Sequence, residues 1–176
     1  PKDRVLTITY AVGGAGAQRE IGADLMRSFA GRLNERTMRL VLVAGTRADV
    51  RDYFEEQRRM ILSPDANVHV MHAPSLDTYF HEFNAVIRET DILWTKPSEM
   101  TFYGALGMPL VLSSPVGEHE KYNRRWAIEH GAAIKQRDPA HAGDWLPELI
   151  SEGVLAGAAW QGFTRMPKFG TYRAAE

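Results

Sequence analysis

Apolar runs alternate with amphipathic stretches along most of this chain. The runs are rich in Val, Ile and Leu, and near-continuous apolar runs are typical of parallel strands that are covered on both faces. The pattern predicts strands at Val5–Val12, Met38–Ala44, Asn67–Met71, Asp91–Trp94, Pro109–Ser113 and Ala133–Lys135.

The segments between these runs have the apolar spacing of helices. Apolar side chains recur at every fourth position from Ile21 to Leu33, which places them on one helix face. Helices are predicted at 18–33, 47–60, from Ser75 (with an apolar stripe of Leu76, Phe80, Phe83 and Ile87), from about Ser98, at about 119–130 and at 140–151. Repeated strand–helix units joined by right-handed crossovers predict an α/β fold. We expect a doubly wound, mostly parallel, six-stranded Rossmann-like sheet in three αβα layers.

The periodic pattern ends near residue 152. We expect residues 1–152 to form one Rossmann-like domain. Residues 153–176 contain Trp160 and Phe163 but little periodicity, and we expect this tail to pack on the domain or on a missing N-terminal domain. Because the chain begins at Pro1 without Met, we interpret it as a fragment.

Composition excludes several function classes. The formal net charge is −1 and there is no cysteine, which argues against a nucleic-acid binder and leaves no thiolate metal site. The histidines show no metal-ligand spacing such as H-E-x-x-H, and no apolar run approaches the length of a membrane span. We expect a cytoplasmic protein.

A glycine turn follows the first predicted strand. Gly13, Gly14, Ala15 and Gly16 would let backbone N–H groups approach an anion closely. The turn begins like a dinucleotide fingerprint, but Arg19 stands at the final glycine position and no acidic residue ends the second strand. Taken alone, the turn is also compatible with a tight strand-to-helix connection that binds nothing.

Two further polar turns follow the fourth and fifth predicted strands. Ser98 and Glu99 would either face a phosphate and a ribose or simply cap a helix. Lys96 would either pair with phosphate or be an ordinary solvated lysine. Helix N-termini at one sheet edge form a seat for a phosphorylated ligand.

The turn after the fifth strand carries His119, Glu120 and Asn123 at the start of a helix. His119 and Glu120 would form hydrogen bonds to the hydroxyls of a sugar. Alternatively, His119 would simply be exposed to solvent and Glu120 would complement the helix dipole. Asn123 could brace the loop.

The three turns, Gly107-Met108-Pro109 and Gly131-Ala132-Ala133 occur in an order that resembles the C-terminal, donor-binding domain of GT-B glycosyltransferases. The closest resemblance is to the branch of the peptidoglycan lipid-intermediate N-acetylglucosaminyltransferase and the monogalactosyldiacylglycerol synthases. It covers the chain from Val5 to about Ala133. It implies transfer of a sugar from a nucleotide-diphospho-sugar, usually a UDP-sugar, to an acceptor hydroxyl, with no metal and no cofactor.

The resemblance also implies roles for individual residues. It places Gly14, Ala15 and Gly16 near the diphosphate, and Lys96 or Arg19 would add positive charge there. It places Ser98 and Glu99 at the phosphate–ribose turn. The donor sugar would lie near His119, Glu120 and Asn123, with His119 as the candidate catalytic residue, and the base would lie against His72 and Ala73.

Two differences from the family's sequence pattern leave alternative functions open. Phe102 occupies the position of the family's ribose-binding glutamate, and His119-Glu120 replace a frequent glutamine. A nucleotide-sugar 2-epimerase and a non-catalytic nucleotide-sugar-binding domain therefore remain as alternatives. The missing N-terminal domain would supply the acceptor site and any peripheral membrane association, and the isolated fragment would transfer nothing.

Overall fold

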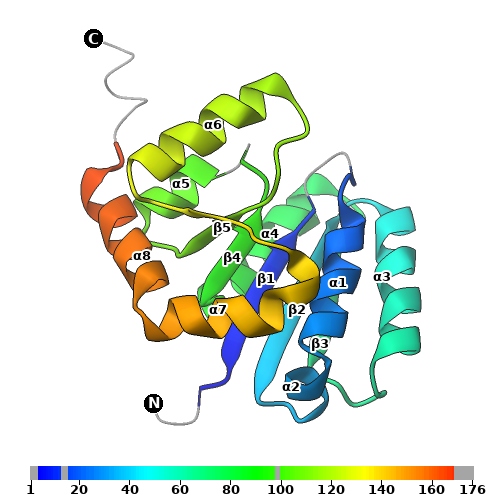
Figure 1. The fold of residues 1–176 in the computed structure, drawn as a ribbon. Helices are drawn as coiled ribbons and strands as arrows, with labels where there is room; N and C mark the ends of the chain where they lie inside the picture. Colours follow the sequence, from blue (N-terminus) through cyan, green and yellow to red (C-terminus); the bar gives the residue numbers. More distant parts are fainter. Residues whose placement is uncertain (1–3, 13–15, 98–99, 169–176) are drawn as a thin grey trace.

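The structure, a computed structural model, describes residues 4–12, 16–97 and 100–168. Its elements follow the predicted strand–helix alternation (Figure 1). They are β1 (Leu6–Ala11), α1 (Arg19–Ser28), α2 (Ala30–Asn34), β2 (Met38–Gly45), α3 (Ala48–Ile61), β3 (Val68–His72), α4 (Leu76–Glu89), β4 (Ile92–Thr95), α5 (Met100–Ala105), β5 (Leu110–Leu112), α6 (Glu118–Glu129), β6 (Ile134–Lys135), a 3₁₀ turn (Pro139–His141), α7 (Ala142–Ser151) and α8 (Val154–Arg165).

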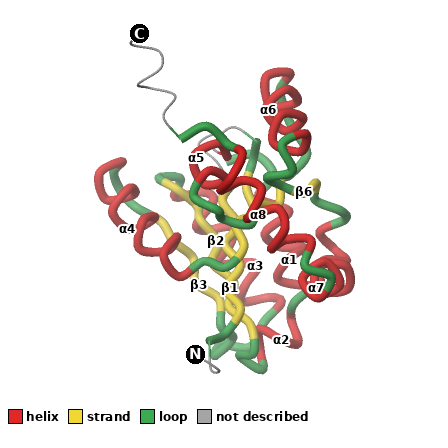
Figure 2. The backbone as a smooth tube through the Cα atoms, turned by 90° about the vertical axis from the view of Figure 1, so that its left-hand side faces the viewer, coloured by secondary structure: helices red, strands yellow, loops and turns green. Residues whose placement is uncertain are grey.

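The predicted fold class is confirmed. The six strands form one sheet in the order β3-β2-β1-β4-β5-β6, and every neighbouring pair is parallel. Helices α1, α3 and α7 lie on one side of the sheet and α4 lies on the other (Figures 1 and 2). This is the three-layer arrangement that right-handed crossovers produce.

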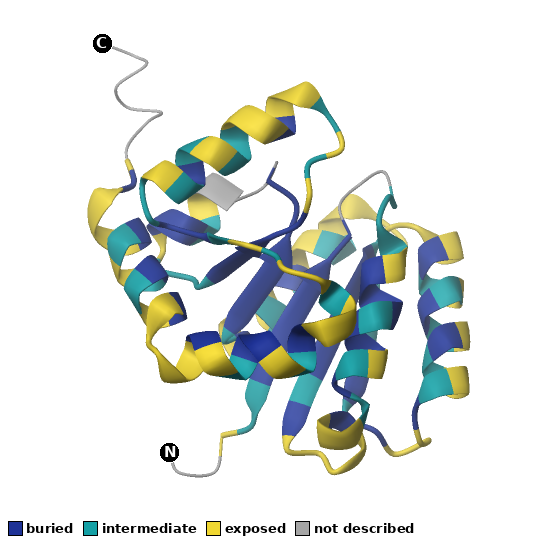
Figure 3. Ribbon diagram, in the orientation of Figure 1, coloured by how far each residue is buried: buried dark blue, intermediate teal, exposed yellow. Residues whose placement is uncertain are grey.

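The core divides between the two faces because strand side chains alternate. Ile8, Tyr10 and Trp94 pack with α1, α3 and α7 in the larger cluster. Ala11 and Val43 pack on the opposite face against Phe83 of α4. The inner strands β1, β2, β4 and β5 are buried almost throughout their length (Figure 3), whereas the edge strands β3 and β6 are only partly buried.

Two differences from the predicted elements have local causes. The helix predicted over 18–33 is broken at Phe29, whose ψ of 9° leaves the helical region, so α1 and α2 are separate. The tail, for which no element was predicted, contains the helix α8, which packs on α5 and α7.

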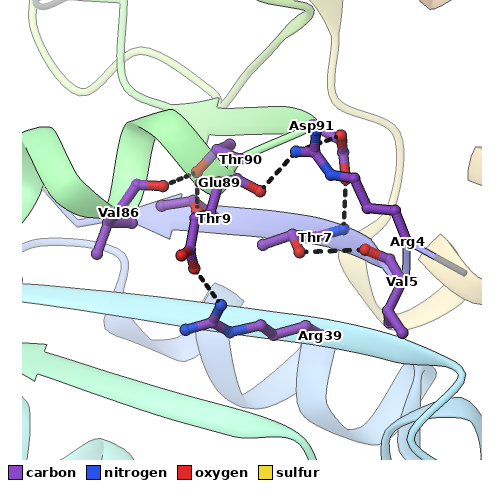
Figure 4. A network of polar contacts seen from close by, with 9 residues as sticks. All are labelled: Arg4, Val5, Thr7, Thr9, Arg39, Val86, Glu89, Thr90 and Asp91. Carbon is purple, nitrogen blue, oxygen red and sulfur yellow. Dashed lines mark hydrogen bonds and ion pairs between the residues drawn. The ribbon is translucent and has the colours of Figure 1, made fainter. Parts of the chain in front are cut away.

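A polar cluster joins β1 to the end of α4 at the amino edge of the sheet (Figure 4). Asp91 accepts the Thr7 N–H at 2.8 Å and pairs with Arg4 at 2.9 Å. Below it, the hydroxyls of Thr9 and Thr90 lie 2.6 Å apart, and the Thr90 hydroxyl donates to the Val86 carbonyl at 2.9 Å. Thr9 must therefore donate to Thr90.

This order of donors predicts unequal effects of two isosteric substitutions. Thr90→Val should lower the free energy of unfolding by about 1–3 kcal/mol, because it leaves the buried Thr9 hydroxyl without a partner. Thr9→Val should cost less than about 1 kcal/mol, because Thr90 keeps its carbonyl acceptor. The double variant should be more stable than Thr90→Val alone, which urea unfolding would measure. Equal effects of the two single variants would contradict the assigned donors.

Candidate functional site

All six strands end at the same edge of the sheet because they are parallel. The strand order reverses between β1 and β4, and the connections from these two strands diverge from that point. In open α/β sheets, ligands usually bind at such a point. Five of the predicted donor-binding residues lie outside the described part of the chain: Gly13, Gly14, Ala15, Ser98 and Glu99.

The described end of the first loop requires glycine. Gly16 has a φ of +69°, and a Cβ there would lie 3.0 Å from a Val50 methyl group. Any larger residue would be strained at this point. Arg19, at the start of α1, lies over the ring of Tyr53 at 4.6 Å and near Asp49. It is therefore engaged with α3.

Gln18 connects the first loop to the loop after β5. Its side-chain nitrogen donates to the Ser114 carbonyl at 2.8 Å, and its side-chain oxygen accepts the Ser113 hydroxyl at 3.1 Å. Its own carbonyl accepts the Tyr10 hydroxyl at 2.7 Å. Burial raises the pKa of Tyr10 far above its usual range, so this hydroxyl stays protonated and remains a donor. Sequence reasoning did not identify Gln18.

Lys96 directly follows β4, between the loops that Gln18 connects. Its side chain and backbone together are only 6% exposed, so the alternative of an ordinary solvated lysine is wrong. No hydrogen bond or ion pair joins Lys96 to another residue in the described ranges. Lys96 therefore places a mostly buried side chain, without a partner among the described residues, at the carboxyl end of β4.

The loop before α6 is held by Glu120. Glu120 is 6% exposed, and its carboxylate accepts the Val116 N–H at 2.7 Å. This contact restrains the loop and occupies one carboxylate oxygen. His119 is exposed and Asn123 is half-buried on the same helix. Of the three residues predicted to contact the sugar, His119 is thus the most accessible to a ligand.

The predicted base-binding residues lie at the end of β3. Ala73 is fully buried, and its N–H donates to the Gly45 carbonyl at 2.9 Å. His72 is half-buried. Neither residue lines the cavity beside them, which lies between the end of β2, α4 and α5.

This cavity has a volume of about 440 Å³, within the range of about 300–1,000 Å³ that is usual for small-molecule sites. It is largely apolar and aromatic, and we call it the aromatic pocket. Tyr79 stacks on Phe83 at 5.3 Å, and Phe83 meets Tyr103 edge-on at 5.9 Å. The lining residues are Val43, Ala44, Gly45, Thr46, Arg47, Leu76, Tyr79, Phe80, Phe83, Phe102 and Tyr103.

The aromatic pocket was not predicted from the sequence. Leu76 and Phe80 were predicted to lie on one helix with Phe83, and they are 65% and 59% exposed at the pocket. Phe102, also 66% exposed, puts an aromatic ring where the resemblance predicts a ribose-binding carboxylate. Arg47 lies at the same pocket, where its hydrogen bond to Asp49 raises its pKa above the usual value.

Residues 4–12, 16–97 and 100–168 contain neither a candidate metal site nor a candidate membrane-spanning helix. No three His, Cys, Asp or Glu side chains there are grouped so that they could hold a metal ion. None of the helices there combines the length and the apolar character needed to cross a bilayer.

Solved structures with the same fold are GT-B glycosyltransferases and related epimerases. MurG of Acinetobacter baumannii superposes with a TM-score of 0.70 at 15% identity, over 99% of this chain and 49% of that chain. MnaA of S. aureus, solved with UDP, gives 0.67 at 15% identity, over 99% and 45%. The UDP-GlcNAc 2-epimerase of Neisseria meningitidis, bound to UDP-GlcNAc, gives 0.63 at 14% identity, over 90% and 40%.

The chain thus spans less than half the length of each of these proteins. At these identities the likeness shows the fold, that of the Rossmann-like C-terminal domain of GT-B proteins. No curated protein matches the sequence. Residues 55–176 match a family described as a domain of unknown function, DUF6938. Since the match covers more than half of the sequence, the chain belongs to this DUF6938 family.

Proposed function

We propose that this domain binds a nucleotide-diphospho-sugar, with UDP as the first nucleotide to test, and acts as the donor half of a glycosyltransferase. The observation that carries the proposal is Lys96, a largely buried lysine without a partner in the described residues, at the end of β4 beside the point where the strand order reverses. A cation in this state gains most from an anion, because its stem is already desolvated and ordered. The diphosphate would lie there.

The aromatic pocket supports a nucleoside as the other end of the ligand. It lies at the same carboxyl edge of the sheet as Lys96. Planar bases stack favourably on exposed aromatic side chains, and Phe80 and Phe102 offer two of them. The base would therefore lie against α4 and α5, next to the predicted positions His72 and Ala73.

The sugar would extend from the diphosphate toward the loop before α6. His119 is the exposed side chain there and is the candidate for contact with the sugar hydroxyls. The loop after β1 and the turn containing Ser98 and Glu99 would complete the phosphate contacts as helix N-termini do. Charge that develops on the leaving diphosphate would be stabilised by Lys96 and by backbone N–H groups.

Titration calorimetry of this chain with UDP, UMP and uridine tests the donor site. We expect UDP to bind more tightly than UMP, and UMP more tightly than uridine, because each phosphate adds a charge that Lys96 can pair with. The affinity for UDP should fall as salt rises. Equal affinities for the three ligands, or no heat with any of them at millimolar concentration, would contradict the proposal.

A nucleotide-sugar 2-epimerase is a second candidate, favoured by two similar structures that contain UDP or UDP-GlcNAc. Incubation of a protein that contains both this chain and the proposed acceptor half with UDP-GlcNAc and no acceptor distinguishes the two enzymes, because only an epimerase would change the sugar. Binding of the donor without either reaction would identify a non-catalytic domain. This chain alone should transfer no sugar, since the proposed acceptor half is not part of it.

A further inference from the structure

Gln18 adopts a backbone conformation that ordinary side chains avoid. Its φ of 70° and ψ of 24° lie in the left-handed region, at the residue that precedes α1. The only other non-glycine residue with positive φ in the described ranges is Arg36, which follows the end of α2. Left-handed residues are common after helices but not before them. Gln18 makes no side-chain cap of α1 either, so capping does not explain the conformation.

The contacts of Gln18 explain why a side chain is kept there. The carbonyl group is fixed by the Tyr10 hydroxyl and by the Ile21 N–H. The side-chain amide uses its oxygen for the Ser113 hydroxyl and its nitrogen for the Ser114 carbonyl. Both ends of the amide are therefore occupied, and the orientation of the group is determined by its partners.

The contact between Gln18 and the loop after β5 passes over the end of a strand, β4. In the sheet, β4 lies between β1 and β5. Gln18 comes from the loop after β1, and Ser113 and Ser114 directly follow β5. The side chain of Gln18 therefore connects two loops on either side of the end of β4, the point at which Lys96 begins.

We propose that Gln18 is a positioning residue for the diphosphate site. It holds the start of α1 and the loop after β5 at a fixed separation on the two sides of Lys96, so that groups from both loops meet the same anion. The inference rests on the proposed nucleotide-sugar site and adds a residue that holds its two walls together.

Glutamine suits this role better than its close relatives. Glutamate has the same length but offers no donor to the Ser114 carbonyl. Asparagine tolerates the left-handed region but is shorter by one methylene, so it would not reach both partners. Glycine would adopt the backbone conformation without strain but would lose the contact with the second loop.

The Gln18→Gly variant separates strain from positioning. Its thermal midpoint should stay close to that of the unsubstituted chain, because relief of backbone strain offsets the lost hydrogen bonds. Its affinity for UDP, measured by calorimetry, should fall about tenfold, and its affinity for UMP should fall less. The ratio of the two affinities is the decisive measurement, because general loosening of the fold would lower both affinities alike. Gln18→Asn should behave in the same way and serves if the glycine variant does not fold.

The outcomes are distinct. Wild-type affinity for UDP in Gln18→Gly would overturn the positioning role while the proposed function stands. Equal losses for UDP and UMP, together with a lower thermal midpoint, would show that Gln18 only supports the fold. If the unsubstituted chain itself binds no UDP, the proposed function fails and the positioning role fails with it.

Discussion

Substitution of Lys96 with methionine is expected to weaken UDP binding about tenfold to hundredfold without loss of stability. Methionine has a similar length and is apolar, so it fills the space of the lysine stem. A hydrogen bond to a charged group contributes about 1.5–3 kcal/mol, which corresponds to this range of affinity. The free energy of unfolding should stay the same or rise, because the variant removes a buried cation that has no partner in the described residues. Calorimetry and urea unfolding would measure the two effects.

The matched control is Lys135→Met. Lys135 ends β6 at the same edge of the sheet, but its side chain is exposed. The control removes the same formal charge from the chain, and solvent screens the loss. UDP affinity should change less than about twofold in this control. If Lys96→Met binds UDP as the control does, Lys96 is no ligand contact and the proposed function loses its main support.

The local hydrophobic pattern was sufficient to predict the sheet because its inner strands are buried on both faces. Runs such as Met38–Gly45 are apolar at nearly every position, and no helix or loop reading fits such a run between two turns. The doubly wound parallel arrangement was predicted from crossover handedness, but the order of the strands was not.

The helix α8 was missed because small residues make its buried face. Leu155, Ala158 and Gly162 face the core, whereas the large Trp160 is 68% exposed. A stripe of alanine and glycine carries little hydrophobic signal, and the exposed aromatics point to the wrong face. The close approach of the α8 and α5 backbones is a tertiary contact, and the spacing of apolar residues along one helix does not predict it.

The site was only partly predictable for a related reason. The polar turns indicated the correct edge of the sheet, because turn residues act locally. The burial of Lys96 and the contact between Gln18 and Ser113 join positions that are remote in sequence. The aromatic pocket likewise combines β2, α4 and α5. Periodicity placed Leu76 and Phe80 on one helix with Phe83 but did not show that this helix lines a pocket with β2 and α5.

Substitution of Gly162 with alanine is expected to lower the free energy of unfolding by about 1–3 kcal/mol, the usual cost of overpacking. A Cβ at this position of α8 would lie 2.5 Å from the carbonyl oxygen of Gly104 in α5. Because that oxygen belongs to a backbone, α8 and α5 would have to separate. The α5 helix also carries Phe102 and Tyr103 to the aromatic pocket, so uridine binding should weaken in the same variant.

The same substitution elsewhere in α8 should have the opposite effect. A Cβ at Gly157 would meet no atom within 4 Å, so Gly157→Ala adds only helix propensity and should raise stability by about 0.5–1 kcal/mol. The two variants have identical composition and lie in one helix, and urea unfolding of both therefore isolates the contact with α5. If both alanines stabilise the protein, α8 does not pack on α5 through Gly162 in solution.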